Sequence, residues 1–518
     1  MILLSWFLKQ PFPQLWSVWV ALVIFVGLSD SGHAEVKPNI VLIMCDDMGW
    51  SDIGCYGGEV LTPNLDRLAS EGLRFTQFYN CAKCTTTRAA LLTGLYPRQR
   101  NGPLLSESMV TLGEALGTAG YQTALSGKWH LGSVKPRRPI DRGFQEFYGL
   151  MDGCCHYFNP AKPDPEFKNN RVRAFGHNEE ILTEFSDNFY STDAFTDHAV
   201  RNIRQMAKSD APYFTHICYT APHYPLHAPE EDVQRYLGKY KDGWERLRKT
   251  RHERLVRLGL IDPGWKLPPA DPEAGSWDDQ LHKDWQDRRM AVYAAMIDRM
   301  DQGIGQILDA IDQSGEKDHT MILFLSDNGG CSEKYAQDLP ENSAGSPDHY
   351  MTCGPGWAFA QNTPFRRFKT WMHEGGISTP LIVRWPGVIQ PNSVTDQVGH
   401  IIDFMPTFLE AAKADYPKEY SERAIIPMEG KSLLPIFDGR MREGHDTMWW
   451  EYNGNRAIRE ADWKLVWDRK VKDWELYHMK NDRTEMVDLA SQYPERVKKM
   501  ATSWSNWAMR TGAIATQK

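Results

Sequence analysis

The stretch NIVLIM, residues 39–44, decides the fold class. It is an unbroken apolar run rich in β-branched side chains, which is typical of a strand buried on both faces in a parallel sheet. Similar runs occupy residues 121–126, 213–220 and 320–325, with helical patterns between them. This alternation predicts an α/β fold with a mostly parallel central sheet sandwiched by helices.

The pattern changes after about residue 425. Short alternating segments at 456–459, 463–467 and 474–477 are separated by turn residues, which predicts a small antiparallel sheet. We therefore expect a main domain at residues 35–425 and a C-terminal subdomain at 426–518.

Residues 230–290 are charged and rich in Trp. We interpret them as an excursion of the main domain near its active-site edge, with a solvated charged face. A role as a lid is the alternative.

The first residues have the features of a signal peptide. Lys9 precedes an apolar run at 15–28 that only Ser17 interrupts, and Gly32-His33-Ala34 offers small residues for cleavage before Glu35. The run is too short for a typical membrane span. We expect residues 1–34 to direct export to the periplasm or the medium, with an uncleaved membrane anchor as the alternative.

Composition excludes several classes of partner. The chain has 518 residues and a formal net charge of -8, which argues against a general nucleic-acid binder. We also expect no stable membrane partner. Nine Cys residues are few for an exported chain of this length, so no disulfide scaffold is predicted, and no connectivity can be read from the sequence.

Acidic side chains follow two of the predicted strands. Asp46 and Asp47 follow residues 39–44 after Cys45, and Asp327 and Asn328 follow residues 320–325 after Ser326. In open α/β sheets, ligands bind beyond the carboxyl ends of strands. An oxygen-only set of this kind suits Ca²⁺ or Mg²⁺ and not zinc.

The stretch CTTTRAALLTG, residues 84–94, predicts a functional group at the start of a helix. The threonine triplet at 85–87 precedes strong helix formers, so we expect it to form the N-cap region. Cys84 then lies at the mouth of the helix, where the backbone favours an anion, with Arg88 one turn away. From the residues alone, Cys84 is either a buried packing residue or a thiolate nucleophile that needs a nearby base.

Two further segments after predicted strands carry basic side chains. Lys128 and His130 alternate by two, so on an extended segment they would share a face. His223 lies in a loop that closely spaced prolines make rigid, which favours a role as acid or base.

A series of these segments, in chain order, resembles the motifs of formylglycine-dependent (type I) sulfatases of the alkaline phosphatase superfamily. The segments are NIVLIMCDDMGW (39–50), CTTTRAALLTG (84–94), GKWHLG (127–132), APHYP (221–225), SDNGG (326–330) and NTPFRRFKTWMHEGG (362–376). A closing segment contributes Tyr477, Asp482, Glu485, Asp488 and Leu489. The resemblance covers nearly the whole mature chain, and the excursion after His223 is similar to that of bacterial arylsulfatases.

The resemblance implies an arylsulfatase-like hydrolase of sulfate esters, with aryl sulfates or sulfated carbohydrates as substrates. It implies that a maturation enzyme oxidises Cys84 to formylglycine, whose hydrate is the nucleophile. Arg88 would hold that hydrate, while Lys128, His130, His223 and Lys369 would grip the sulfate and the leaving group. The implied ligands of one Ca²⁺ are Asp46, Asp47, Cys84 in its oxidised form, Asp327 and Asn328.

Two positions depart from the family pattern. Thr86 stands where the family usually has Pro or Ala, and Ser378 stands where Arg is common. Two alternatives accompany the sulfatase interpretation. One is a metal-dependent phosphoester or phosphonate hydrolase of the same superfamily, and the other is a non-catalytic binding protein in which Cys84 keeps its thiol.

Overall fold

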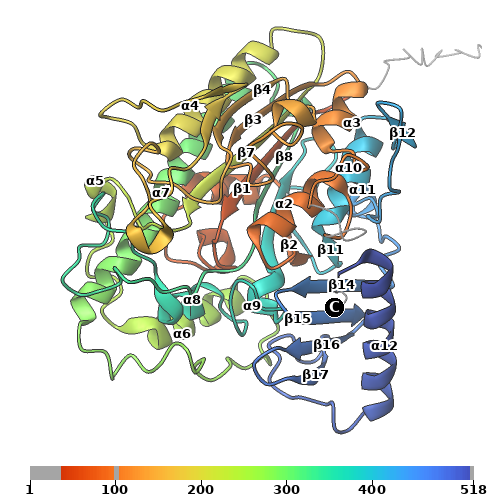
Figure 1. The fold of residues 1–518 in the computed structure, drawn as a ribbon. Helices are drawn as coiled ribbons and strands as arrows, with labels where there is room; N and C mark the ends of the chain where they lie inside the picture. The colour runs from red at the N-terminus through yellow and green to blue at the C-terminus, as the bar shows by residue number, and fades with distance from the viewer. Residues whose placement is uncertain (1–36, 98–103, 514–518) are drawn as a thin grey trace, which may run out of the picture. The chain divides into compact units, whose positions relative to one another are not determined.

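The computed structural model describes residues 37–97 and 104–513 (Figure 1). The predicted signal peptide at 1–34 lies outside these residues. Within the two described ranges, every helix is either too short or too polar to span a bilayer.

An eleven-stranded sheet runs through the centre of the main domain (Figure 1). In spatial order its strands are β10 (Ser393–Thr395), β2 (Leu73–Tyr79), β9 (Ser378–Arg384), β8 (Thr320–Ser326), β1 (Asn39–Asp46), β7 (Tyr213–Pro222), β3 (Gln122–Gly127), β4 (Glu146–Leu150), β5 (Phe175–His177) and β6 (Glu180–Ile181), with β11 (Gly399–His400) on β2. The ladders from β8 through β1, β7 and β3 to β4 are parallel. The predicted mostly parallel sheet is thus confirmed, although β9 runs antiparallel to both β8 and β2.

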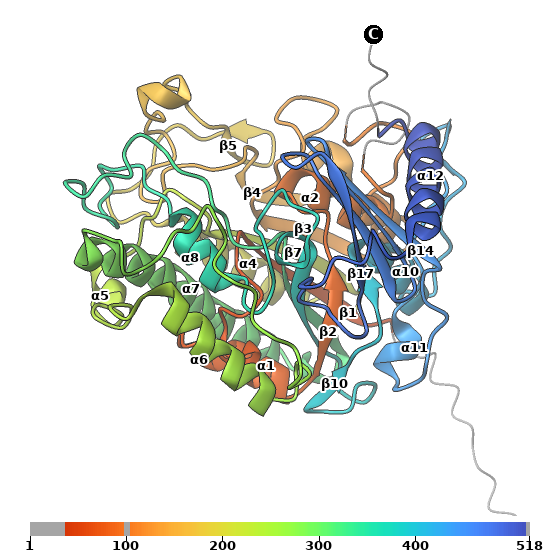
Figure 2. The same ribbon diagram turned by 90° about the horizontal axis from the view of Figure 1, so that it is seen from below.

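Helices cover both faces of the sheet (Figures 1 and 2). Alternate side chains of β1 enter two different cores: Val41 and Ile43 join one, and Ile40 and Leu42 join the other. The first core includes side chains of α1 (Pro63–Ser70), α4 (Ser191–Met206), α6 (Gly243–Arg257), α7 (Lys283–Gln313) and α8 (Gly354–Gln361). The second includes side chains of α2 (Cys84–Thr93), α3 (Leu112–Thr118), α10 (Phe404–Ala411), α11 (Leu434–Phe437) and α12 (Pro494–Thr511).

The register of the parallel strands brings their carboxyl ends to one edge. Cys45 of β1 lies opposite Ser326 of β8, and Gly127 of β3 lies opposite Cys218 of β7. The segments that follow these strands therefore leave the sheet side by side. Because β9 runs in the opposite direction, the segment that precedes it reaches the same edge.

The C-terminal part contains the predicted antiparallel sheet. Its strands are β14 (Thr447–Tyr452), β15 (Asn455–Glu460), β16 (Trp463–Asp468) and β17 (Asp473–His478), and α12 packs on one face (Figure 1). The other face packs on Tyr79 of β2 and on Ile377 of α9 (Glu374–Ile377). A two-stranded pair, β12 (Glu419–Tyr420) and β13 (Arg423–Ala424), precedes it. The boundary at 425/426 stays a prediction.

The charged excursion at 230–290 contains α5 (Glu230–Val233), α6 and the first turns of α7. Arg251 of α6 is fully buried and forms ion pairs with Asp52 at 2.6 Å and Glu59 at 2.8 Å. The excursion is thus anchored to the loop after β1. Its role as a lid stays a prediction.

A buried ionic network joins the C-terminal sheet to the main domain. Lys464 of β16 donates to Glu374 at 2.7 Å and to Glu485 at 2.8 Å, and Arg483 donates to Glu374 at 2.9 Å. Burial raises the pKa of Glu374, but Lys464, Arg483 and Arg459 together outweigh this and hold that pKa at about 2. The network therefore depends on every charge being compensated.

We expect Lys464→Met to lower the free energy of unfolding by about 3–5 kcal/mol, because it leaves two buried carboxylates short of a cation. Urea denaturation followed by far-UV circular dichroism measures the change. Lys499→Met, at an exposed position of α12, is the matched control and should change it by less than about 0.5 kcal/mol. Equal effects of the two substitutions would contradict the role given to the network.

Candidate active site

Helix α2 begins at Cys84, whose side chain is 1% exposed. The expectation that the threonine triplet forms the N-cap was wrong, because the N-cap position is Lys83 and no side chain caps the helix there. Thr86 lies inside the first turn and donates to the carbonyl of Cys81 at 2.8 Å, while Thr87 accepts from the Cys81 amide at 3.0 Å. The triplet fixes the preceding turn and leaves Cys84 at the helix mouth.

The predicted metal-binding residues meet beyond the ends of β1 and β8. Asp46, Asp47, Asp327 and Asn328 are all buried at this edge. Ligand atoms of Asp46, Asp327 and Cys84 lie within 4.8 Å of one another. The two strand ends and the start of α2 thus converge on one point.

Each of the three carboxylates is paired with one buried basic side chain. The pairs are Lys128 with Asp46, Arg88 with Asp327 at 2.9 Å, and Lys369 with Asp47 at 2.7 Å. Lys369 comes from the segment before β9. Burial lowers its pKa, but Asp47 and other nearby acidic groups together outweigh this and raise that pKa above the ordinary value. Lys128 follows β3 and Lys369 precedes β9, and these two strands lie on opposite sides of β1 and β8 in the sheet. The two lysines therefore approach the carboxylates from opposite sides.

Two oxygens of the cluster accept no hydrogen bond within the described part of the chain. They are Oδ1 of Asp46 and Oδ1 of Asn328, and both are buried. Burial and the nearby charge of Asp327 raise the pKa of Asp46. Unpaired buried acceptors next to repelling carboxylates are the arrangement that a hard divalent cation would satisfy.

Both predicted histidines reach the cluster. His130 Nδ1 lies 3.4 Å from Cys84 Sγ, and His223 Nε2 lies 3.5 Å from an oxygen of Asp47. His130 has a φ of 59°, so the Lys-x-His segment is not extended at this residue as expected, and a left-handed backbone conformation directs the ring instead. Burial lowers the pKa of both rings, and the charge of Lys128 lowers each further.

A model of the sulfatase family matches residues 38–414, which is more than half of the chain. The chain belongs to the sulfatase family. A second family model, N-sulphoglucosamine sulphohydrolase C-terminal, matches residues 365–506. This sulfatase is a hydrolase of sulfuric esters.

Relatives extend over most of the sulfatase chain. An uncharacterized sulfatase of Schizosaccharomyces pombe is 33% identical and covers 92% of this chain and 94% of its own. An arylsulfatase of Klebsiella aerogenes is 31% identical and covers 82% of this chain and 97% of its own. The crystal structure of Ps i-CgsB in complex with k-i-k-neocarrahexaose has a TM-score of 0.68, with 25% identity over 92% of this chain and 93% of its own.

Arg88 of the sulfatase lies on the buried side of the cluster. One guanidinium nitrogen donates to Asp327 and the other donates to the carbonyl of Lys128 at 2.8 Å. Arg88 therefore connects the segment that follows β3 to the segment that follows β8. Arg88 supports this carboxylate, and the role that the resemblance implies for it, holding the hydrate at position 84, stays a prediction.

Sequence reasoning gave no role to Lys83 or Glu333, which border the cluster. Their charged groups lie 3.8 Å apart, and Glu333 also accepts from the hydroxyls of Tyr224 and Tyr335. Burial raises the pKa of Glu333, but Lys369 and Lys83 outweigh this and hold it at about 2. The only signal in the sequence was that Lys83 adjoins Cys84 and that Glu333 follows the SDNGG segment.

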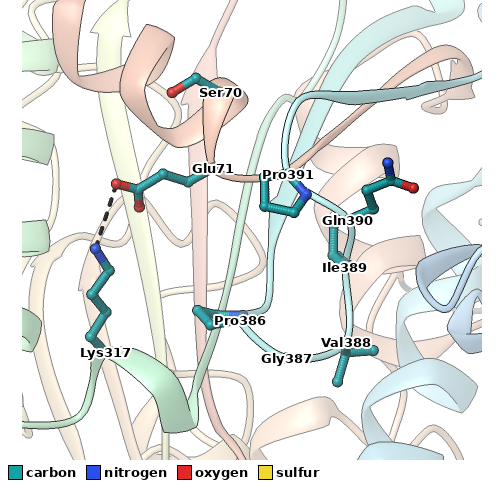
Figure 3. A pocket seen from close by; sticks show the side chains of 9 residues that line it. All are labelled: Ser70, Glu71, Lys317, Pro386, Gly387, Val388, Ile389, Gln390 and Pro391. Atoms are coloured by element: carbon teal, nitrogen blue, oxygen red, sulfur yellow. Dashed lines mark ion pairs between the residues drawn. The ribbon is translucent and has the colours of Figure 1, made fainter.

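A separate pocket lies at the opposite edge of the sheet (Figure 3). It is bordered by Glu71 after α1, by Lys317 before β8 and by residues 386–391 after β9. Glu71 and Lys317 form an ion pair of 3.5 Å across it. None of the predicted site residues lines this pocket.

We expect the imidazoles of His130 and His223 in the EDTA-treated protein to bind protons only at a pH below that at which free histidine titrates. Their pKa values lie below the ordinary 6.5, so protons bind only in more acidic solution. Histidine ¹³Cε1 NMR measures this, with signals assigned through His130→Gln and His223→Gln and with free histidine as the reference. A signal from either ring that titrates at or above pH 6.5 would refute the assignment.

Proposed function

We propose that this sulfatase cleaves its sulfate ester with an oxygen nucleophile on side chain 84, formed by oxidation of Cys84 to formylglycine, beside one bound Ca²⁺. The convergence of Cys84 with Asp46 and Asp327 at the mouth of α2 carries the proposal. The proposed catalytic residues are the ones that the resemblance to the family implies: Cys84, Arg88, Lys128, His130, His223 and Lys369.

The proposed ligands of Ca²⁺ are Asp46, Asp47, Asp327, Asn328 and the side chain at 84. The unpaired oxygens of Asp46 and Asn328 support this set. Since each carboxylate already has a basic partner, the cluster without metal is close to neutral. A bound divalent cation would add positive charge opposite an anionic sulfate group and would stabilise the charge that develops on its oxygens.

The hydrated aldehyde at position 84 supplies a hydroxyl as nucleophile and a second hydroxyl that permits release of sulfate. His130, 3.4 Å from the γ atom of residue 84, is placed to move a proton there. The macrodipole and free amides of α2 favour negative charge at this point. Lys128 and Lys369 are placed to donate to sulfate oxygens.

His223 has a defined tautomer in this arrangement. Its Nδ1 lies 2.5 Å from the carbonyl of Tyr224, which can only accept, so Nδ1 carries the proton. The neutral ring then presents a lone pair at Nε2. We therefore assign protonation of the leaving group to a lysine ammonium, Lys128 or Lys369, and positioning of the substrate to His223.

A sulfated carbohydrate is the proposed substrate class. An aromatic group next to the site includes Tyr224 and Tyr335, with ring centroids 5.2 Å apart, and the partly exposed Phe167 stacks on Tyr335. Lys369 Nζ lies 5.9 Å from the centroid of Tyr224, so this group adjoins the catalytic cluster. The similar structure of Ps i-CgsB holds k-i-k-neocarrahexaose, which supports an oligosaccharide partner.

The maturation partner and the location are parts of the proposal that rest on the sequence. Oxidation of Cys84 requires a formylglycine-generating enzyme that acts on the segment around it. The apolar run at residues 15–28 supports export to the periplasm or the medium.

We expect Cys84→Ala to lower hydrolysis of an aryl sulfate at least about a thousand-fold, because it removes the nucleophile. Cys55→Ala, at another buried cysteine, is the control and should retain activity. The release of sulfate and of phosphate from matched aryl esters is measured in parallel. Faster release of phosphate would favour the phosphohydrolase alternative.

Mass spectrometry of the peptide that contains residue 84 tests the modification itself. Replacement of the thiol by an aldehyde is the expected result in protein purified from its native host. Retention of sulfur together with no hydrolysis would favour the non-catalytic binding protein.

We expect Ca²⁺ at one hundred times its dissociation constant to stabilise the EDTA-treated protein by about 2.7 kcal/mol. Thermal unfolding with Ca²⁺ and with EDTA measures the difference. Asn328→Leu should abolish most of it, since it removes one of the unpaired oxygens, whereas Asn481→Leu, at an exposed position, should preserve it. Identical melting of the wild type in both conditions would exclude a structural Ca²⁺.

A further inference from the structure

A second group of metal-ligating side chains lies outside the candidate active site. It consists of Glu146 of β4, His177 of β5 and His198 of α4, with ligand atoms within 4.8 Å of one another. The Nε2 atoms of His177 and His198 lie 2.8 and 3.3 Å from the same oxygen, Oε1 of Glu146. Two imidazoles and one carboxylate thus converge on one point.

Neighbouring side chains hold the three groups in place. Asn178 donates to the other carboxylate oxygen of Glu146 at 3.0 Å, which leaves Oε1 to face the histidines. Ser126 Oγ lies 2.7 Å from Nδ1 of His198. Where Nδ1–H donates to this hydroxyl, the lone pair of Nε2 points at Glu146, and that is the tautomer of a metal-bound histidine.

The rings themselves are fixed by one aromatic residue. Tyr148 stacks on His198 with centroids 5.2 Å apart and meets His177 edge-on at 6.0 Å. Helix α4 covers this end of the sheet, where β4 also lies (Figure 1). Little rearrangement would therefore be needed for the three groups to share an ion.

We propose that Glu146, His177 and His198 form a zinc site that ties strands β4 and β5, near one edge of the sheet, to helix α4. Imidazole nitrogens with one carboxylate suit Zn²⁺, whereas Ca²⁺ takes oxygen ligands. In a tetrahedral site with bonds of 2.0–2.1 Å, neighbouring ligand atoms lie about 3.3 Å apart. The separation between Glu146 and His198, 3.3 Å, has this value, whereas His177, at 2.8 Å from the same oxygen, would move outward by about 0.5 Å to share the ion.

The three proposed ligands differ in how far solvent reaches their side chains. His198 is 4% exposed, while Glu146 is 35% and His177 is 47% exposed. Solvent can therefore reach the ion and complete its coordination with water. The site contains none of the residues proposed for sulfate hydrolysis, and its role is to fasten the edge of the sheet.

Zinc binding to the full-length protein tests the inference. Metal is stripped with chelator, the protein is saturated with Ca²⁺, and Zn²⁺ is titrated by calorimetry with the stoichiometry confirmed by elemental analysis. His177→Ala and Glu146→Gln should each weaken the binding at this site at least about 10-fold. His319→Ala, at an exposed histidine before β8, is the matched control and should bind like the wild type.

Two further measurements separate this site from other zinc-binding groups and from a role in catalysis. Zn²⁺ should raise the melting temperature of the wild type and of His319→Ala, but not of His177→Ala. The rate of hydrolysis of an aryl sulfate should be the same in His177→Ala as in the wild type. This comparison keeps the test of the zinc site separate from the test of the proposed function. Equal zinc stoichiometry and affinity in the wild type and His177→Ala would overturn the inference.

Discussion

Burial of three carboxylates at one edge of the sheet is the constraint on which the site depends. Asp46, Asp47 and Asp327 stand at the ends of adjacent strands, where their mutual repulsion and loss of hydration would each cost several kcal/mol if left uncompensated. Basic side chains from three separate segments offset that cost. The need for neutrality therefore accounts for the positions of Arg88, Lys128 and Lys369 without reference to a substrate.

The sheet topology explains how residues so distant in sequence reach this edge. Four parallel strands end at the same level, so the residues after β1, β3, β7 and β8 become neighbours. Lys369 arrives from the other direction because β9 is antiparallel. Gly329 permits the approach, since a Cβ there would lie 1.8 Å from the carbonyl of Gly375. Backbone packing and charge pairing thus act on the same few residues.

The sequence predicted the parts of this arrangement that follow from local patterns. Apolar runs such as residues 39–44 identify buried strands, and acidic residues directly after such runs must lie at a sheet edge. Other parts depend on contacts between distant segments. The left-handed backbone at His130, the antiparallel β9, and the pairing of Lys83 with Glu333 have no local signature, because tertiary packing selects them. The prediction that the threonine triplet caps α2 failed for a related reason. The hydroxyls of Thr86 and Thr87 form hydrogen bonds with the backbone of Cys81 in the preceding turn and do not cap the helix.

The C-terminal sheet supports the same site from behind. Asn455 of β15 donates to the carbonyl of Thr370 at 2.9 Å, and the amide of Thr370 donates to the carbonyl of Ala82 at 2.7 Å. Trp450 of β14 donates to the carbonyl of Asn80 at 2.8 Å. These bonds hold the backbone beside Lys369 and the turn that precedes α2. An antiparallel sheet that contributes no residue to the carboxylate cluster therefore helps to set the distance between Lys369 and the side chain at 84.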